Sequence, residues 1–289
     1  MSDPSQAIYL GLTHLDLGGA QVDFGDGILL REANARFLLP LTLVTTRDKP
    51  NEHHPAFVQL SAREVNVTAE LTVPTAGDAV EKSFATGRLL VFLLRLMTNP
   101  EIGCGVVSRQ SLREIRTVSD VENARMHSAE TVPRHFLIQL VDKESVVESL
   151  DWVRDHWKVA DRMYNKNAEF KLAADAIDGG QFIPNSALAL VSLWGALEAL
   201  FSPSTAELKF RVSSLIAAYL EAPGSARLTE QKRIATLYDK RSAAAHGKPR
   251  HAGDDLLATF ELLRRVLIRM VEQGAVPSKD KLEETLFGA

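Results

Sequence analysis

The chain has 289 residues, which is enough for two domains of about 100–200 residues each. Hydrophobic residues make up 45% of the sequence and charged residues 24%, so a core of normal size is available and no disulfide framework is needed. A formal net charge of −4 argues against indiscriminate binding to nucleic acids. The single cysteine, Cys104, excludes an intramolecular disulfide and fits a reducing cytosol.

The sequence shows no targeting or membrane segment. Residues 1–6 are polar and lack the basic and apolar regions of a signal peptide. The most apolar run, residues 89–97, is interrupted by Arg95 and is much shorter than the roughly 20 residues that a membrane span needs. We therefore expect a cytoplasmic protein with no membrane partner.

Residues 7–74 have the composition of short β-strands. Between residues 65 and 73, apolar residues alternate with polar ones, which is the pattern of a half-buried strand. Glycine-rich or polar segments at 18–19, 25–27 and 48–51 predict turns. A small antiparallel sheet is expected, with strands at residues 8–12, 28–30, 37–44, 57–60 and 65–73.

The following segment mixes helical and strand patterns. A helix is expected over residues 79–98, ending at Asn99-Pro100, and strands are expected over 102–107 and 135–141. The polar stretch 108–131 fits either a loop or a short helix. Together these elements predict a β-rich α+β domain over residues 1–143, suited to sensing a trigger or docking a partner.

One segment of this domain combines potential metal ligands, Asn51, Glu52, His53 and His54. Adjacent histidines in a polar loop next to proline are usually exposed, and no second group of ligands has metal-binding spacing. We therefore expect no metal site and no cofactor.

The second half of the sequence is helical. A long helix is expected over residues 144–165, and short connections predict that the later helices pack antiparallel in an all-α bundle over residues 144–289. The whole chain is therefore expected to be an α+β protein. A helix over 170–177 is expected to end at Gly179-Gly180, and the last helix is expected to end at Gly274. The expected N-cap residues are Asn185 or Ser186 for the helix with Trp194 and Ser204 or Thr205 for the helix after it. Thr229 is expected to cap the helix with Arg241 and His246, and Asp254 or Asp255 the last helix.

Positive charge is concentrated between residues 227 and 250. This segment has seven Lys and Arg residues but only two acidic ones, and His246 and His251 lie nearby. Either a phosphate-bearing partner or a solvated helix face would account for this composition.

Arg241 and His246 are the strongest candidates for chemistry. Five positions separate them by about 140° around a helix axis, and the long arginine side chain can bring its guanidinium toward the helix end. His246 should occupy the last turn, since Gly247 suits a left-handed end residue and Pro249 prevents continuation.

A guanidinium beside an imidazole suits metal-independent RNA cleavage, in which a 2′-hydroxyl attacks the neighbouring phosphate. Histidine can move a proton to or from the reacting oxygens, and arginine can stabilise charge on the phosphoryl group. One histidine cannot easily serve as both base and acid, so a second copy from a dimer partner is expected to complete the site.

Two blocks of sequence resemble the HEPN superfamily, and within it the Apea-like group. Residues 193–201, LWGALEALF, resemble the family's tryptophan-to-glutamate helix. Residues 237–247, LYDKRSAAAHG, resemble its tyrosine, arginine and histidine-glycine block. The order and separation of the blocks also fit, and the resemblance extends over about residues 165–275.

The resemblance implies a HEPN-like helical bundle, often dimeric, in which Arg-x4–6-His marks metal-independent endoribonucleases of antiviral defence and toxin–antitoxin systems. Arg241 and His246 match this motif. Ser242 takes the place of the polar residue, commonly asparagine, that follows the arginine in many active members. Some members lack activity and serve only in binding or dimerisation.

The surrounding residues have open roles. Glu198 can orient Arg241 through an ion pair or accept a proton, and Tyr238 can contact RNA or lie partly buried with a bonded hydroxyl. Lys240, Lys248 and Arg250 are either phosphate contacts or ordinary surface charge.

The sequence thus predicts a HEPN-type endoribonuclease, a homodimer that acts on RNA without a cofactor. The alternatives are a non-catalytic module that binds RNA or nucleotide or only dimerises, and a ribonuclease toxin controlled by an antitoxin.

Overall fold

A computed structural model describes residues 7–39, 42–49, 52–58, 63–75, 79–130, 132–136, 138, 146–201, 207–248 and 250–288. The chain forms two compact units. The N-terminal unit comprises Met1–Val91 and Glu101–Thr131, and the C-terminal unit comprises Phe92–Pro100 and Val132–Ala289. The sequence-based boundary was placed at 143/144, with residues 92–100 in the first domain.

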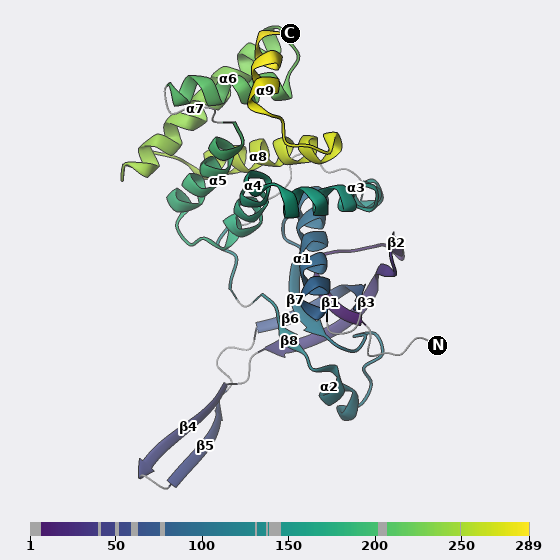
Figure 1. The fold of residues 1–289 in the computed structure, drawn as a ribbon. Helices are drawn as coiled ribbons and strands as arrows, with labels where there is room; N and C mark the ends of the chain where they lie inside the picture. The colour runs from purple at the N-terminus through teal and green to yellow at the C-terminus, as the bar shows by residue number, and fades with distance from the viewer. Residues whose placement is uncertain are drawn as a thin grey trace. The chain divides into compact units, whose positions relative to one another are not determined.

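The N-terminal unit is built on a six-stranded sheet in the order β2-β3-β6-β1-β7-β8, with antiparallel neighbours (Figure 1). The half-buried alternation expected along the fifth predicted strand was wrong over residues 69–73, because Glu70 and Thr72 are buried as well as Ala69, Leu71 and Val73. The predicted antiparallel sheet is nevertheless confirmed. Its strands are β1 (Ala7–Thr13), β2 (Val22–Gly25), β3 (Ile28–Leu39), β6 (Arg63–Pro74), β7 (Gly103–Ser108) and β8 (His127–Ser128).

A separate two-stranded sheet pairs β4 (Thr42–Lys49) with β5 (Glu52–Val58). The single strand expected over residues 37–44 was wrong, because β3 ends at Leu39 and β4 begins at Thr42. His53 and His54 lie in β5 rather than in the polar loop that the sequence suggested. Residues 59–60 of another expected strand lie outside the described residues.

Both faces of the large sheet are covered. On one face lies α1 (Val80–Met97), where a side chain at Gly87 would come within 3.0 Å of Leu10 (Figure 1). This close approach explains the glycine. On the other face, the chain that follows β7 packs Leu112 against Val67 and Val106, which belong to one buried cluster. The central strands are thus packed on both faces, whereas both residues of the edge strand β8 are exposed.

The second covering segment is held by a buried carboxyl group on β6. Glu70 is fully buried and accepts hydrogen bonds from the Ser111 hydroxyl at 3.0 Å and from the backbone N–H of Leu112 at 2.6 Å. The guanidinium of Arg31 lies 3.8 Å away. Burial raises the pKa of Glu70, although these hydrogen bonds and Arg31 oppose the rise.

We expect this carboxyl to make stability depend on pH. The folded chain retains the proton of Glu70 to a higher pH than the unfolded chain does. Its contribution to the free energy of unfolding is therefore complete below the ordinary value of 4.5 and is lost as pH rises through the raised pKa. Urea denaturation between about pH 4 and 8 should show the stability of wild type relative to Glu70→Gln falling with pH.

Glu64 provides a matched control on the same strand. It is exposed, and its hydrogen bond with Arg36 lowers its pKa, so the stability of wild type relative to Glu64→Gln should not fall with rising pH. A flat or rising difference curve for Glu70→Gln would contradict the assignment.

The stretch after β7 contains a short helix, α2 (Val118–Ala124), which resolves the alternatives left open for residues 108–131. Thr117 caps it by accepting from the N–H of Asp120. The strand expected over 135–141 was wrong at residues 135, 136 and 138, which are not in a strand. The remaining residues of that range lie outside the described part of the chain.

The C-terminal unit is a helical bundle around buried aromatic side chains, among them Phe170, Trp194 and Phe201. The α+β fold with a helical C-terminal region is therefore confirmed. Its elements, with the 3-10 helix η1, are α3 (Val146–Lys166), α4 (Ala168–Gly179), η1 (Gly180–Phe182), α5 (Ser186–Phe201), α6 (Leu208–Leu220), α7 (Ser225–Ala245), α8 (Gly253–Gln273) and α9 (Lys279–Phe287) (Figure 1).

Several predicted helix ends differ from the structure. Gly179 and Gly180 end α4 as predicted, but both keep right-handed angles and the chain continues as the 3-10 helix η1. Thr229 does not cap α7, which begins four residues earlier at Ser225. Asp255 is not the residue before α8. It lies within the first turn and accepts from the N–H of Ala252.

Other ends agree with the sequence or fall outside the description. Asn185 begins α5, with its side-chain oxygen accepting from the N–H groups of residues 187 and 188. Gly274 ends α8 in the left-handed conformation. Ser204 and Thr205 lie outside the described residues, and Glu207 directly precedes α6.

The end of α1 is fastened within the C-terminal unit. The last carbonyl groups of a helix have no partner inside the helix. Here the carbonyl of Leu96 accepts from Arg264 at 2.5 Å, and that of Met97 accepts from the buried Ser149 at 3.3 Å. Side chains of later helices therefore complete the hydrogen bonding of α1.

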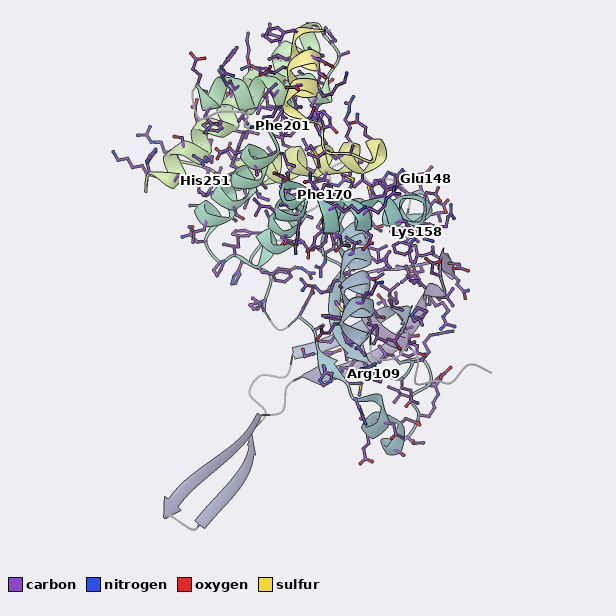
Figure 2. The ribbon with its side chains drawn as sticks, viewed as in Figure 1. Arg109, Glu148, Lys158, Phe170, Phe201 and His251 are labelled. Carbon is purple, nitrogen blue, oxygen red and sulfur yellow. The ribbon has the colours of Figure 1, made fainter. Side chains whose placement is uncertain are left out.

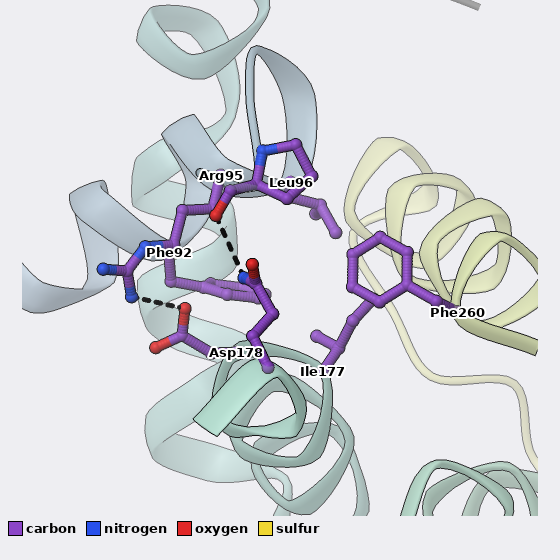
Figure 3. A pocket seen from close by; sticks show the side chains of 8 residues that line it. Phe92, Arg95, Leu96, Ile177, Asp178 and Phe260 are labelled. Atoms are coloured by element: carbon purple, nitrogen blue, oxygen red, sulfur yellow. Dashed lines mark hydrogen bonds and ion pairs between the residues drawn. The ribbon is translucent and has the colours of Figure 1, made fainter. Parts of the chain in front are cut away.

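Two further contacts act beside this helix end (Figure 3). Arg95 is buried and forms an ion pair with Asp178 at 2.8 Å, and Gln181 donates to the carbonyl of Pro100 at 3.0 Å. A cavity of about 10 Å³ adjoins them, which is room for one water molecule. The contacts fix residues 95–100 against α4 and η1.

Candidate functional site

The sequence motif with Arg241 and His246 lies at the C-terminal end of α7. The helix ends in a Schellman motif, in which the N–H of Lys248 reaches the carbonyl of Ala243 at 2.9 Å and the N–H of Gly247 reaches that of Ala244 at 3.1 Å. Gly247 has a φ of +71°, the left-handed angle that the sequence predicted. His246 is therefore the residue at which the helix stops.

Arg241 projects from α7 to α5, where it pairs with Glu198. The guanidinium Nη2 lies 3.0 Å from the Glu198 carboxylate, and only about a fifth of each side chain is exposed. The same guanidinium lies over the ring of Tyr238, 5.6 Å from its centre. Residues from both sequence blocks thus hold Arg241 in one place.

Trp194 packs against Tyr238, the residue on which the Arg241 guanidinium lies. It is fully buried on α5, one turn before Glu198, and its ring meets Tyr238 edge to face at 5.1 Å. Tyr238 is only 8% exposed, so it is a packing residue beneath Arg241 and not a freely accessible base contact. The order of contacts is Trp194, Tyr238, Arg241 and Glu198.

This packing changes the pKa of the Tyr238 hydroxyl. Burial raises the pKa of the Tyr238 hydroxyl, the negative charge of Glu198 raises it further, and Arg241 opposes the rise. Among the described residues, Glu198 Oε1 and Arg241 Nε are buried without a hydrogen-bond partner.

His246 lies beyond the cluster and is exposed. Within the part of the chain that the structure describes, no hydrogen bond joins its ring to Arg241 or to any other residue. Ser242 is half-buried, and its carbonyl accepts from the N–H of His246 at 3.1 Å. The two candidate catalytic residues therefore share a helix end but not a contact.

The candidate phosphate contacts differ from one another. Lys240 donates to the carbonyl of Arg250 at 3.1 Å and lies 3.6 Å from Asp255, so it holds the loop between α7 and α8. Lys248 and Arg250 are exposed. These two follow His246 closely along the chain.

Much of the positive charge along α7 serves the fold. Arg233 forms an ion pair with Glu230 at 2.8 Å, and Arg227 donates to the carbonyls of Glu221 and Thr285. The charge excess that the sequence displays is thus partly neutralised. The exposed remainder includes Lys232 within α7 and Lys248 and Arg250 after its end.

His251 is a site residue whose role sequence reasoning missed. Its Nε2 lies 2.9 Å from the hydroxyl of Ser186, which joins the loop after α7 to the start of α5. No sequence spacing signals this pair, since the two residues lie 65 positions apart. The contact holds the exposed loop near the helix that carries Glu198.

Among the described residues, no group of three or more His, Cys, Asp or Glu side chains is arranged to hold a metal ion. None of the described helices has the length and apolar character required to cross a membrane. No family model matches the chain, and no similar protein was found among the curated proteins or the solved structures.

Proposed function

We propose that the chain is a metal-independent endoribonuclease of the HEPN type, with its catalytic residues at the end of α7. The observation that carries the proposal is the anchored guanidinium of Arg241 on the same helix end as the exposed imidazole of His246. This pair, one group fixed and the other accessible, suits a reaction at a phosphodiester in a flexible RNA strand.

In the proposed reaction the 2′-hydroxyl of one nucleotide attacks the adjacent phosphorus and expels the 5′-oxygen of the next. His246 moves the proton at one of these oxygens. Arg241 stabilises the charge that builds on the phosphoryl oxygens, and Glu198 and Tyr238 keep its guanidinium in position. Ser242 borders the site from the half-buried face of α7.

A second copy of the chain would supply the other proton-transfer group. One imidazole cannot act on both oxygens in the same step, and His246 stands exposed at a helix end, where another copy can approach it. We therefore propose a homodimer through the helical unit. The exposed Lys248 and Arg250 would contact RNA phosphates, whereas Lys240 would keep the loop in place.

We propose that the protein works in the cytoplasm, in antiviral defence or as the toxin of a toxin–antitoxin pair, with the N-terminal unit receiving the trigger or the partner. A specific observation favours one alternative, a non-catalytic module that binds RNA or nucleotide. The guanidinium of Arg241 is already paired with Glu198, as in a purely structural ion pair.

RNA cleavage with and without a chelator tests the mechanism. We expect the purified full-length chain to cut a labelled RNA pool equally well in both conditions and to leave 2′,3′-cyclic phosphate ends, because the 2′-hydroxyl is the nucleophile. Mass spectrometry of the fragments identifies the ends. Inhibition by the chelator, or 5′-phosphate products, would contradict the mechanism, and RNA binding without any cleavage would favour the non-catalytic module.

A further inference from the structure

The N-terminal unit contains a cavity of about 290 Å³ that the proposed ribonuclease site does not use. It lies between the first turn of α1 and the edge of the sheet formed by β7 and β8. Its apolar lining includes Ile8, Phe84 and Val107. Its polar lining includes Arg109, Arg125 and His127. Arg109 is labelled in Figure 2.

The strand register explains why these residues meet. Val107 on β7 pairs with Leu10 on β1 and with His127 on β8, so these side chains share one face of the sheet. Leu10 faces α1, as its closeness to Gly87 shows. Arg109 follows Val107 by two positions and keeps to the same face. The strand register therefore places these lining residues on one face of the sheet.

Arg125 reaches the cavity from the end of α2 and not from the sheet. It is the residue at which α2 ends, and it has a φ of 45°, an angle that glycine or asparagine adopts more readily. The chain thus places a long cationic side chain where a small residue would be less strained. Arg125 is one of the residues that line the cavity.

The charges of the lining favour an anion. Among the described residues, neither Arg109 nor Arg125 has a side-chain hydrogen bond or ion pair, whereas most arginines of the helical unit are paired. Glu81 is the acidic residue of the lining. The first turn of α1 borders the cavity, and its N–H groups add partial positive charge.

The apolar residues restrict the kind of anion. Inorganic phosphate would leave Ile8, Phe84 and Val107 uncovered, whereas a flat ring would lie against them. The volume is near the lower end of the about 300–1,000 Å³ of small-molecule sites. One small ligand therefore fits, with an anionic group at one end and a planar apolar group at the other.

We propose that this cavity binds a mononucleotide, with its phosphate between Arg109 and Arg125 and its base against Phe84. Arginine and phosphate form charge-assisted hydrogen bonds. His127, exposed on β8, stands at the rim, where the sugar or the phosphate would pass. The proposal does not depend on the ribonuclease activity, because every lining residue belongs to the N-terminal unit.

Calorimetric titration of the full-length protein tests the site. The probes are the four nucleoside 5′-monophosphates, the corresponding nucleosides and inorganic phosphate. We expect at least one monophosphate to bind tenfold or more tightly than its nucleoside and than phosphate, since only the nucleotide uses both ends of the cavity. Equal binding of phosphate and nucleotide, or no binding of any monophosphate, would overturn the proposal.

Variants locate the binding within the cavity. Arg109→Ala and Arg125→Asn should each weaken nucleotide binding about tenfold or more, and asparagine tolerates the backbone angle of residue 125. Phe84→Leu should weaken the nucleotide but not phosphate. Arg113→Ala, an exposed arginine outside the cavity, should bind like wild type.

Circular dichroism of each variant separates lost binding from lost folding. If the folded Arg109 and Arg125 variants bind nucleotide as wild type does, the cavity is not the site. A short single-stranded RNA that competes for the cavity more tightly than every mononucleotide would replace the proposal with an RNA-binding surface.

Discussion

Alanine at Arg241 or at His246 is expected to reduce RNA cleavage by the full-length chain by about 10²–10⁴-fold while leaving the fold intact. Removing His246 removes the group that moves a proton. Removing Arg241 removes the fixed positive charge that Glu198 and Tyr238 hold in place. Single-turnover cleavage of a labelled RNA, with enzyme in excess, measures the loss at the chemical step.

The chain offers a matched control for each variant. Arg269 also lies over a tyrosine, Tyr219, at 5.3 Å and donates to a backbone carbonyl, but it belongs to another part of the bundle. His156 stacks on Trp152 away from the end of α7. Arg269→Ala and His156→Ala should cleave at the wild-type rate. If the variants at residues 241 and 246 cleave no more slowly than these controls, the catalytic assignment is wrong.

Trp194→Ala is expected to lower the free energy of unfolding by about 3–5 kcal/mol. The side chain is fully buried on α5, and its removal would leave a cavity beneath Tyr238. Tyr238 in turn supports Arg241, so the ion pair with Glu198 should loosen as well. Urea denaturation followed by circular dichroism measures the loss.

Trp194→Phe distinguishes packing from hydrogen bonding. Among the described residues, the indole N–H of Trp194 has no acceptor, so replacing it removes an unpaired buried donor along with some contact area. The phenylalanine variant should therefore lose much less stability than the alanine variant. Equal losses for the two variants, or a loss below about 1 kcal/mol for alanine, would mean that the packing around Trp194 is not what stabilises the bundle.

The sequence predicted the elements with strong periodicity and missed those that tertiary contacts create. The helix at 79–98 and the strand at 65–73 were found because their apolar residues repeat at regular spacing. Helix α9 (Lys279–Phe287) was not predicted, since Leu282 is its single buried residue and leaves almost no pattern. Arg227 reaches the carbonyls of Thr285 and Leu286 near its end, a contact that local sequence cannot show.

Helix ends were harder to predict than helix interiors for a similar reason. Thr229 is a good capping residue, yet α7 begins at Ser225, directly after the turn at Pro223 and Gly224 that follows α6. Gly179 and Gly180 end α4 as predicted, yet a 3-10 helix follows at once and carries Gln181, whose side chain donates to the carbonyl of Pro100. In both places the local preference alone does not fix the course of the backbone.

The sequence predicted part of the candidate site's geometry, since it allowed an ion pair between Glu198 and Arg241 and a largely buried Tyr238. The spacing of Trp194 and Glu198 and of Tyr238 and Arg241 indicated two helix faces, and the structure brings those faces together. Nothing in the sequence indicated that Asp255 would hold Lys240, because an ion pair across a loop depends on how two helices meet.

Because the end of α1 is hydrogen-bonded to later helices, the helical unit consists of two separate segments of the chain, residues 92–100 and 132–289. A fragment that began at residue 132 would lack the carbonyls of Met97 and Pro100, and the donors of Ser149 and Gln181 would lose their acceptors. We therefore expect a fragment that lacks residues 92–100 to be less stable than the whole unit. Recombination that exchanges the N-terminal unit would keep these contacts if it left residues 92–100 in place.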